Sequence, residues 1–204
     1  MIKEITLAVG LSIVFAFTAY ADETTTVDPH AHHRAMMKTQ TYQVSDAEYS
    51  IPDVELLDSS GATVALPELL HAGEPIALNF IFTTCTTICP VMTATFAQLQ
   101  RELGADADRV HLVSVSIDPE YDRPEVLASY ATQFQAGGNW TFLTGDTADI
   151  VNVLRSFDVY TGSKMSHRAV TLLKRPDQED TWVRIDGLAS GQSLAHEVTS
   201  RLLN

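Results

Sequence analysis

The sequence predicts an α/β fold in which helices flank a mixed β-sheet, and three observations support this. Short apolar runs that suit strands alternate with stretches of helical periodicity along most of the chain. Residues 76–82 are almost continuously apolar, as expected for a strand buried on both faces of a sheet, and 110–117 form a second apolar run. Near the C-terminus, the polar segment 174–181 (KRPDQEDT) is typical of a turn between antiparallel strands, so the sheet is expected to be mixed.

The first expected elements are a β-hairpin, a buried strand and a helix. Two short apolar runs between Val54 and Leu66 are separated by the turn-forming residues 58–61 (DSSG), which predicts an N-terminal hairpin. The strand at 76–82 leads into the segment TTCTTICP. After this segment, one apolar stripe recurs at helical spacing: Met92, Phe96, Leu99 and Leu103.

The second half continues the alternation of strands and helices. After the strand at 110–117, Asp122 and Glu125 have the spacing of a capping box, with Asp122 as the N-cap of a helix. The remaining elements are expected as a strand at 140–143, a helix at about 147–157, strands near 169–173 and 182–185, and a C-terminal helix. This order, with its antiparallel hairpin, is the pattern of a thioredoxin-like fold.

Length and charge restrict the organisation of the chain and its partners. With 204 residues, 45% of them hydrophobic, the chain suffices for one well-packed domain. Its net charge of −13 would repel nucleic acids and anionic lipid surfaces, so neither is expected as a partner.

The first 21 residues resemble an export signal. Lys3 precedes an apolar run from Leu7 to Ala19, and residues 19–21 (AYA) form a small-x-small cleavage site, which would make Asp22 the mature N-terminus. The run is short for a membrane-spanning helix, but retention as an anchor remains open. We therefore expect an exported protein, periplasmic in a bacterium, whose membrane contact is limited to such an anchor.

Residues 22–41 are polar and lack sustained periodicity, which predicts a flexible tail before a domain at 42–204. This tail contains several imidazole and thioether side chains: His30, His32, His33, Met36 and Met37. Such groups could capture a soft metal ion and pass it to the domain. The alternative is a merely solvated segment.

Cys85 and Cys89 are the only cysteines, and both follow the buried strand where a helix opens at Cys89-Pro90. Free N–H groups and the helix dipole favour thiolates there, and the spacing allows the two sulfurs to meet each other or a shared ion. A purely structural disulfide closing so short a loop would contribute only about 2 kcal/mol. Two inert buried thiols are disfavoured in an oxidising compartment.

Two long segments carry a specific resemblance: residues 80–99 (FIFTTCTTICPVMTATFAQL) and residues 114–131 (SVSIDPEYDRPEVLASYA). The first resembles the cysteine segment, and the second the other signature, of the Sco/SenC family of copper-binding cytochrome c oxidase assembly proteins. The resemblance extends from about Val54 to Asn204. It implies that Cys85 and Cys89 bind copper and can also cycle through a disulfide.

The resemblance also implies a histidine ligand and a neighbouring acidic residue. The family places its third copper ligand at His167, and two thiolates with one imidazole can hold Cu(I) or Cu(II). His71, His111 and His196 are expected to be structural or surface residues. Asp118 either orients a ligand or contacts a partner, as the resemblance implies, or simply forms an Asp-Pro turn.

Two functions of different class are therefore expected from the sequence. The first is a metallochaperone that receives copper from an upstream donor and delivers it to an apo-acceptor, by resemblance the copper subunit of cytochrome c oxidase. The second is a thiol-disulfide oxidoreductase with Cys85 and Cys89 as its catalytic pair. The spacing C-x-x-x-C and the lack of any proline between Pro124 and Pro176 disfavour a thioredoxin-like substrate mode.

Overall fold

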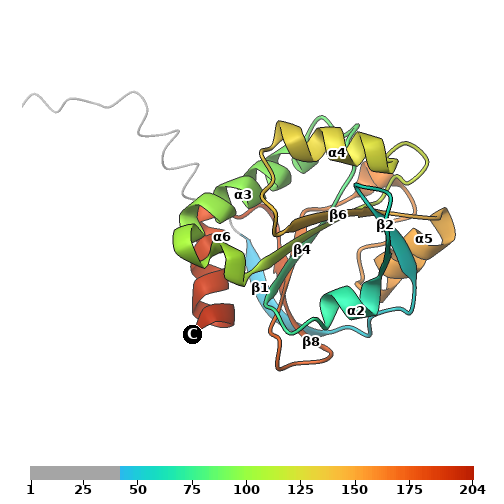
Figure 1. The fold of residues 1–204 in the computed structure, drawn as a ribbon. Helices are drawn as coiled ribbons and strands as arrows, with labels where there is room; N and C mark the ends of the chain where they lie inside the picture. Colours follow the sequence, from blue (N-terminus) through green and yellow to red (C-terminus); the bar gives the residue numbers. More distant parts are fainter. Residues whose placement is uncertain (1–41) are drawn as a thin grey trace, which may run out of the picture.

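A computed structural model describes residues 42–204, in which eight strands form one mixed sheet (Figure 1). The strands are β1 (Gln43–Glu48), β2 (Glu55–Asp58), β3 (Thr63–Ala65), β4 (Ile76–Ile81), β5 (His111–Ser116), β6 (Trp140–Thr144), β7 (Val170–Lys174) and β8 (Thr181–Asp186). Their order in the sheet is β1-β8-β7-β4-β5-β6-β2-β3. β4 is parallel to β5 and β5 to β6, whereas every other pair is antiparallel. The predicted mixed sheet and N-terminal hairpin are confirmed.

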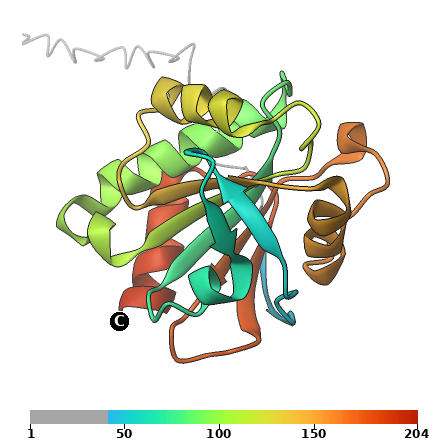
Figure 2. The same cartoon turned by 45° about the vertical axis from the view of Figure 1, so that its right-hand side comes forward.

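Helices cover both faces of this sheet (Figures 1 and 2). They are α2 (Leu66–Leu70), α3 (Ile88–Leu103), α4 (Pro124–Gln133), α5 (Thr147–Ser156) and α6 (Gly191–Val198), with short helical turns η1 (Gly104–Arg109), η2 (Lys164–Ser166) and η3 (Thr199–Leu203). Buried side chains of α3, α4 and α6 share one core cluster, and those of α2 and α5 share the other. The sheet is therefore the middle layer of three.

Strand β4 shows why a continuous apolar run forms a central strand. All its residues are buried, with Ala77 and Ile81 in the α3 cluster and Leu78 and Phe80 in the α5 cluster. Alternate side chains leave opposite faces of a strand, so burial on both faces requires apolar residues at consecutive positions. The predicted apolar stripe of α3 is also fully buried in the core: Met92, Phe96, Leu99 and Leu103.

Strand β1 was not anticipated by the sequence patterns. It pairs with β8 in antiparallel register from Gln43 opposite Asp186 to Glu48 opposite Thr181. Its side chains are exposed or half-buried throughout, because it forms the edge of the sheet. Backbone hydrogen bonds hold such a strand, so its sequence lacks the alternation that would have revealed it.

The capping box expected at the start of α4 is wrong. The structure places Arg123 at the N-cap position without a side-chain cap, and the Arg123 guanidinium pairs instead with Glu125 at 2.8 Å. Asp122 points inward and is completely buried. Its carboxylate accepts hydrogen bonds from Thr83 and Ser116 instead of capping the helix.

Several predictions concern residues outside the described part. The signal or anchor at 1–21 and the tail at 22–41, with His30, His32, His33, Met36 and Met37, precede residue 42. Within residues 42–204, no helix has both the length and the apolar character needed to cross a membrane.

Candidate metal centre

The topology brings three chain segments together at one edge of the sheet. β4 and β5 are parallel neighbours, so the segments that follow them, at 82–87 and 117–122, leave the same edge. β7 runs antiparallel to β4, with Asn79 opposite Thr171, so the segment preceding β7 arrives there as well. Cys85, Asp118 and His167 belong to these three segments.

Cys85 lies in the turn between β4 and α3. Its N–H donates to the Phe82 carbonyl at 3.2 Å, and its sulfur accepts the Cys89 N–H at 3.5 Å and lies 3.5 Å from Thr87 Oγ1. Burial raises the pKa of the Cys85 thiol, but hydrogen bonds from Cys89 and Thr87 outweigh this effect and lower the pKa to about 7. A substantial fraction of Cys85 is therefore thiolate at neutral pH.

Cys89 has the opposite electrostatic environment. It lies in the first turn of α3 and is fully buried. Burial raises the pKa of its thiol to about 12, and the neighbouring Cys85 and the charge of Asp122 add to this, against an opposing hydrogen bond from the Phe82 backbone. Both cysteines are free thiols. The pair therefore combines a reactive thiolate with a protonated thiol behind it.

His167 is largely buried immediately after η2. Its Nε2 lies 2.9 Å from the Phe80 carbonyl oxygen, which can only accept a hydrogen bond, so Nε2 donates. Burial lowers the pKa of His167, although this hydrogen bond partly opposes the effect. The neutral ring with its proton on Nε2 leaves Nδ1 as the nitrogen with a free lone pair.

A cavity of about 360 Å³ joins two of the three expected ligands. It is lined by Cys85 and His167 together with Phe82, Thr84, Thr86, Thr87, Ile88, Lys164 and Met165. Cys89 is not among the lining residues. Within residues 42–204, no three His, Cys, Asp or Glu side chains are already gathered in a geometry that could hold a metal ion. Binding by all three expected ligands thus requires local rearrangement.

Asp122 connects the segments that surround this cavity. Its buried carboxylate accepts the N–H of Thr83 at 3.1 Å, the Thr83 hydroxyl, and the Ser116 hydroxyl at 2.6 Å. Ser116 Oγ in turn accepts the N–H of Asp118 at 3.0 Å. The carboxylate therefore fixes the start of the cysteine segment against the end of β5, a role that sequence reasoning missed because the residue also matched a helix cap.

Asp118 both forms a turn and faces the histidine segment. Its carbonyl accepts the N–H groups of Tyr121 at 3.0 Å and Asp122 at 2.8 Å, and its side chain forms an ion pair with Lys164 of η2. The Lys164 ammonium also lies 5.6 Å from the centroid of the Phe82 ring. Lys164 was not anticipated, because a single lysine in a loop has no motif that would distinguish it.

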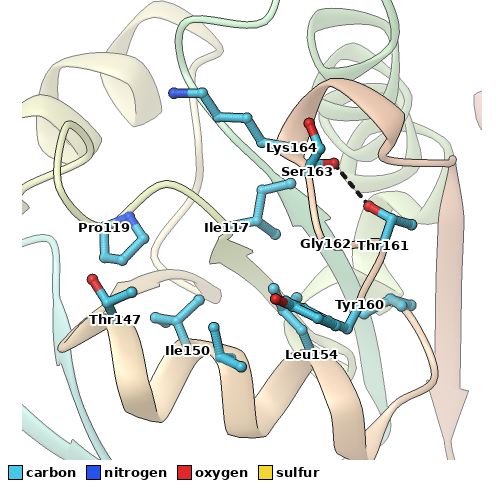
Figure 3. A pocket seen from close by; sticks show the side chains of 12 residues that line it. Ile117, Pro119, Thr147, Ile150, Leu154, Tyr160, Thr161, Gly162, Ser163 and Lys164 are labelled. Carbon is cyan, nitrogen blue, oxygen red and sulfur yellow. Dashed lines mark hydrogen bonds between the residues drawn. The ribbon is translucent and has the colours of Figure 1, made fainter.

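A second hollow, a groove of about 190 Å³ (Figure 3), shares Lys164 with this cavity. Ile150 and Leu154 of α5 form its floor, and Pro119 and Tyr160 lie on opposite sides. Lys164 lines both hollows, so its ion pair with Asp118 marks the boundary between them.

The other histidines of residues 42–204 lie away from this cavity. His111 in β5 forms a hydrogen bond through Nε2 with Thr141 Oγ1 at 2.8 Å, and burial lowers its pKa. His71 follows α2, and His196 belongs to α6. None of the three lines the cavity, in agreement with the expected structural or surface roles.

Comparisons with known proteins identify similar sequences. The SCO1/SenC family model matches residues 43–202. A Bacillus subtilis SCO1 protein homolog is 34% identical over 142 residues, which cover 68% of this chain and 66% of that protein. A mouse mitochondrial SCO2 homolog is 31% identical over 110 residues, covering 53% of this chain and 42% of that protein. The chain therefore matches less than two thirds of these relatives' lengths.

Solved structures support the same comparison. Copper-bound ScoI of Bradyrhizobium japonicum is 27% identical, with a TM-score of 0.62 over 75% of this chain and 99% of that one. BsSco, a member of the Sco family of cytochrome c oxidase assembly proteins in which a disulfide switch was identified, is 31% identical. Its TM-score is 0.64 over 76% of this chain and 95% of that one. The fold is thus the thioredoxin-like fold of Sco proteins.

Proposed function

Because this chain belongs to the SCO1/SenC family, we propose that it is a copper metallochaperone that holds copper on Cys85, Cys89 and His167. The observation that supports this most directly is the shared cavity of Cys85 and His167, with Cys89 in the adjoining first turn of α3. Two thiolate sulfurs and one imidazole suit copper in either oxidation state. The copper-bound relatives support the choice of metal.

Binding would follow an order set by the environments of the three ligands. The Cys85 pKa of about 7 provides a thiolate without the metal, whereas Cys89, with a pKa of about 12, would lose its proton only as copper binds. His167 would bind through Nδ1, or through Nε2 after releasing the Phe80 carbonyl. Copper loading is therefore coupled to proton release and to a local movement.

Delivery would proceed by exchange of these ligands for those of an apo copper protein. We propose the copper subunit of cytochrome c oxidase as that acceptor, and an upstream copper donor as the source. Because residues 1–21 resemble an export signal, either cleaved or retained as an anchor, we propose that this exchange occurs outside the cytoplasm, in the periplasm of a bacterium. The histidines and methionines of the 22–41 tail would assist copper capture.

Anaerobic titration of the reduced chain with Cu(I) against a competing chelator tests the proposed site. We expect one tight equivalent that is lost in Cys85→Ala and Cys89→Ala and weakened in His167→Ala, with His196→Ala as the matched histidine control. Copper bound equally well by the cysteine variants would refute the site. Unchanged uptake at limiting metal after deletion of residues 22–41 would refute the role of the tail.

The unequal thiols favour thiol-disulfide exchange as a second candidate function. The Cys85 thiolate would attack an acceptor disulfide and release one acceptor thiolate. Cys89 would then lose its proton, attack the mixed disulfide and release the second, leaving a Cys85–Cys89 disulfide and a reduced acceptor. A pKa of about 7 suits an attacking thiol near neutral pH, and the buried Cys89 suits a resolving thiol.

Trapping of a mixed disulfide distinguishes this activity from metal delivery. With an oxidised acceptor fragment that contains two copper-ligating cysteines, Cys89→Ser should accumulate a covalent adduct through Cys85, whereas Cys85→Ser should not. Absence of an adduct, together with unchanged acceptor disulfide in the presence of the parent chain, would exclude the second function.

A further inference from the structure

Met165 is the most exposed large apolar side chain within residues 42–204. It is 80% exposed, compared with 44% for Val91, 54% for Tyr121 and 44% for Tyr160. The other methionine in this part of the chain, Met92, is buried on α3. Packing therefore explains Met92 but does not explain why a methionine occupies position 165.

The backbone of Met165 is fixed beside the candidate metal cavity. Its N–H donates to Ser163 Oγ at 3.3 Å, and two backbone bonds follow in the turn, from Ser166 N–H to the Ser163 carbonyl at 3.0 Å and from His167 N–H to the Lys164 carbonyl at 3.2 Å. Met165 lines the same cavity as Cys85 and His167. The unbranched side chain can adjust its position, so a thioether is available at the solvent side of a fixed turn.

The four sulfur and imidazole groups near the cavity differ in how readily they meet a metal from solvent. Cys89 is completely buried, and the Nε2 of His167 is hydrogen-bonded to Phe80. Cys85 is also largely buried and its sulfur accepts the Cys89 N–H, but it lines the cavity, as does Met165, whose side chain is 80% exposed. Thioethers are soft ligands that favour Cu(I) over Cu(II).

We propose that Met165 is an entry ligand that, with Cys85, captures Cu(I) before Cys89 and His167 bind it, an inference that rests on the proposed copper-chaperone function. Copper–sulfur bonds to Met165 and Cys85 form as the bonds to the copper donor break. Cys89 then releases its proton to solvent, Cys89 and His167 bind the metal, and the bond to Met165 breaks. Copper remains Cu(I), so no electron is transferred.

Stopped-flow uptake measurements on the reduced full chain test this order. The probes are Cu(I) supplied as its bicinchoninate complex and Cu(II) supplied as its glycinate complex. Met165→Leu keeps the size and apolar character of the side chain but removes the sulfur, and Met92→Leu makes the same change at a buried position. We expect Met165→Leu to slow Cu(I) uptake about tenfold, because a soft ligand is lost from the first encounter. Cu(II) uptake, the final Cu(I) affinity and the Met92→Leu rates should match the parent.

The other outcomes distinguish a failure of the entry role of Met165 from a failure of the copper-chaperone function. An unchanged Cu(I) rate in Met165→Leu, or equal slowing of Cu(I) and Cu(II), would overturn the entry role, because the second result indicates a disturbed turn. With either of these two results, the proposed function still stands if the parent takes up copper and the Cys85→Ala and Cys89→Ala variants do not. A parent that takes up neither ion would refute both.

Discussion

The cysteine loop, residues 83–89, and the histidine turn, residues 160–167, face one cavity but are held by different interactions. The cysteine loop is joined to the sheet through the buried carboxylate of Asp122 and continues directly into α3. The histidine turn has a short helical turn and the Lys164–Asp118 ion pair, whose lysine side chain is 42% exposed. Buried hydrogen bonds are costly to break, whereas exposed ion pairs contribute little.

If copper binds as proposed, we expect the more weakly held histidine turn to be the half of the site that moves. In the proposed site, Cys85 already lines the cavity as a thiolate, whereas Cys89 must lose its proton and reach the metal from behind the lining. The histidine turn would move His167 toward the two cysteine sulfurs. Binding through Nδ1 would keep the hydrogen bond from Nε2 to the Phe80 carbonyl, whereas binding through Nε2 would break it. Four predictions test this contrast between a rigid loop and an adjustable turn.

The largest expected effect is the loss of the Asp122 carboxylate. Asp122→Ala leaves the Thr83 N–H and two hydroxyl groups without their buried acceptor, which should lower the free energy of unfolding by about 3 kcal/mol. Urea denaturation followed by circular dichroism measures this change. Asp118→Asn, at the partly exposed ion pair, is the control and should change stability by less than about 1 kcal/mol. Equal effects of the two substitutions would contradict the contrast.

The next effect concerns the reactivity of the two thiols. Because a thiol reacts as its thiolate, alkylation of Cys85 in Cys89→Ser should rise about tenfold between pH 6 and pH 8 and then level off, as expected for a pKa of about 7. Cys89 in Cys85→Ser should remain almost unreactive over this range because it is buried. Mass spectrometry of iodoacetamide adducts measures both rates. A rate for Cys85 that still rises steeply above pH 8 would show an unperturbed thiol.

A smaller effect is the dependence of stability on pH. Burial lowers the pKa of His167 and of His111 below their unfolded values, so the unfolded chain binds more protons below about pH 6.5. Stability should therefore be complete above that pH and fall as the pH decreases toward the folded-state values. Urea midpoints at pH 7 and pH 5 should differ less in His167→Gln and in His111→Gln than in the parent. Identical pH dependence in all three chains would show that neither histidine is buried in neutral form.

The sequence predicted the fold best where burial repeats along the chain. The sequence predicts β4 because all its residues are apolar or buried in the sheet, and it predicts α3 because one apolar residue in each turn of that helix faces the core. β1 was missed because an edge strand pairs through its backbone and keeps polar side chains. Asp122 was misassigned because the local spacing of a capping box cannot show that Thr83 and Ser116 compete for the carboxylate.

The candidate site was predictable to different degrees. The strand, loop and helix order placed Cys85 and Cys89 at a sheet edge, but His167 was identified only through resemblance to a family. Its position depends on the antiparallel pairing of β7 with β4, a long-range register that local patterns do not contain. Lys164 and Met165 lie in an irregular turn, where no periodicity distinguishes a side chain that faces a cavity.

The smallest expected effect on stability tests the histidine turn. Lys164→Gln removes the ion pair with Asp118 and should lower the free energy of unfolding by less than about 1 kcal/mol. The same change should accelerate hydrogen exchange at the His167 amide, whose acceptor is the Lys164 carbonyl, while the Cys89 amide stays protected. Arg123→Gln, which removes another exposed ion pair, is the control. Equal acceleration at both amides would show that the loop and the turn open together.

The proposed ligand set is tested most directly by copper K-edge X-ray absorption on the Cu(I)-loaded parent, His167→Ala and His196→Ala. We expect two sulfur ligands and one imidazole nitrogen in the parent and in His196→Ala, with the nitrogen lost in His167→Ala. A two-sulfur site that is identical in all three chains would contradict His167 as a ligand, and a shell without sulfur would contradict the site as a whole.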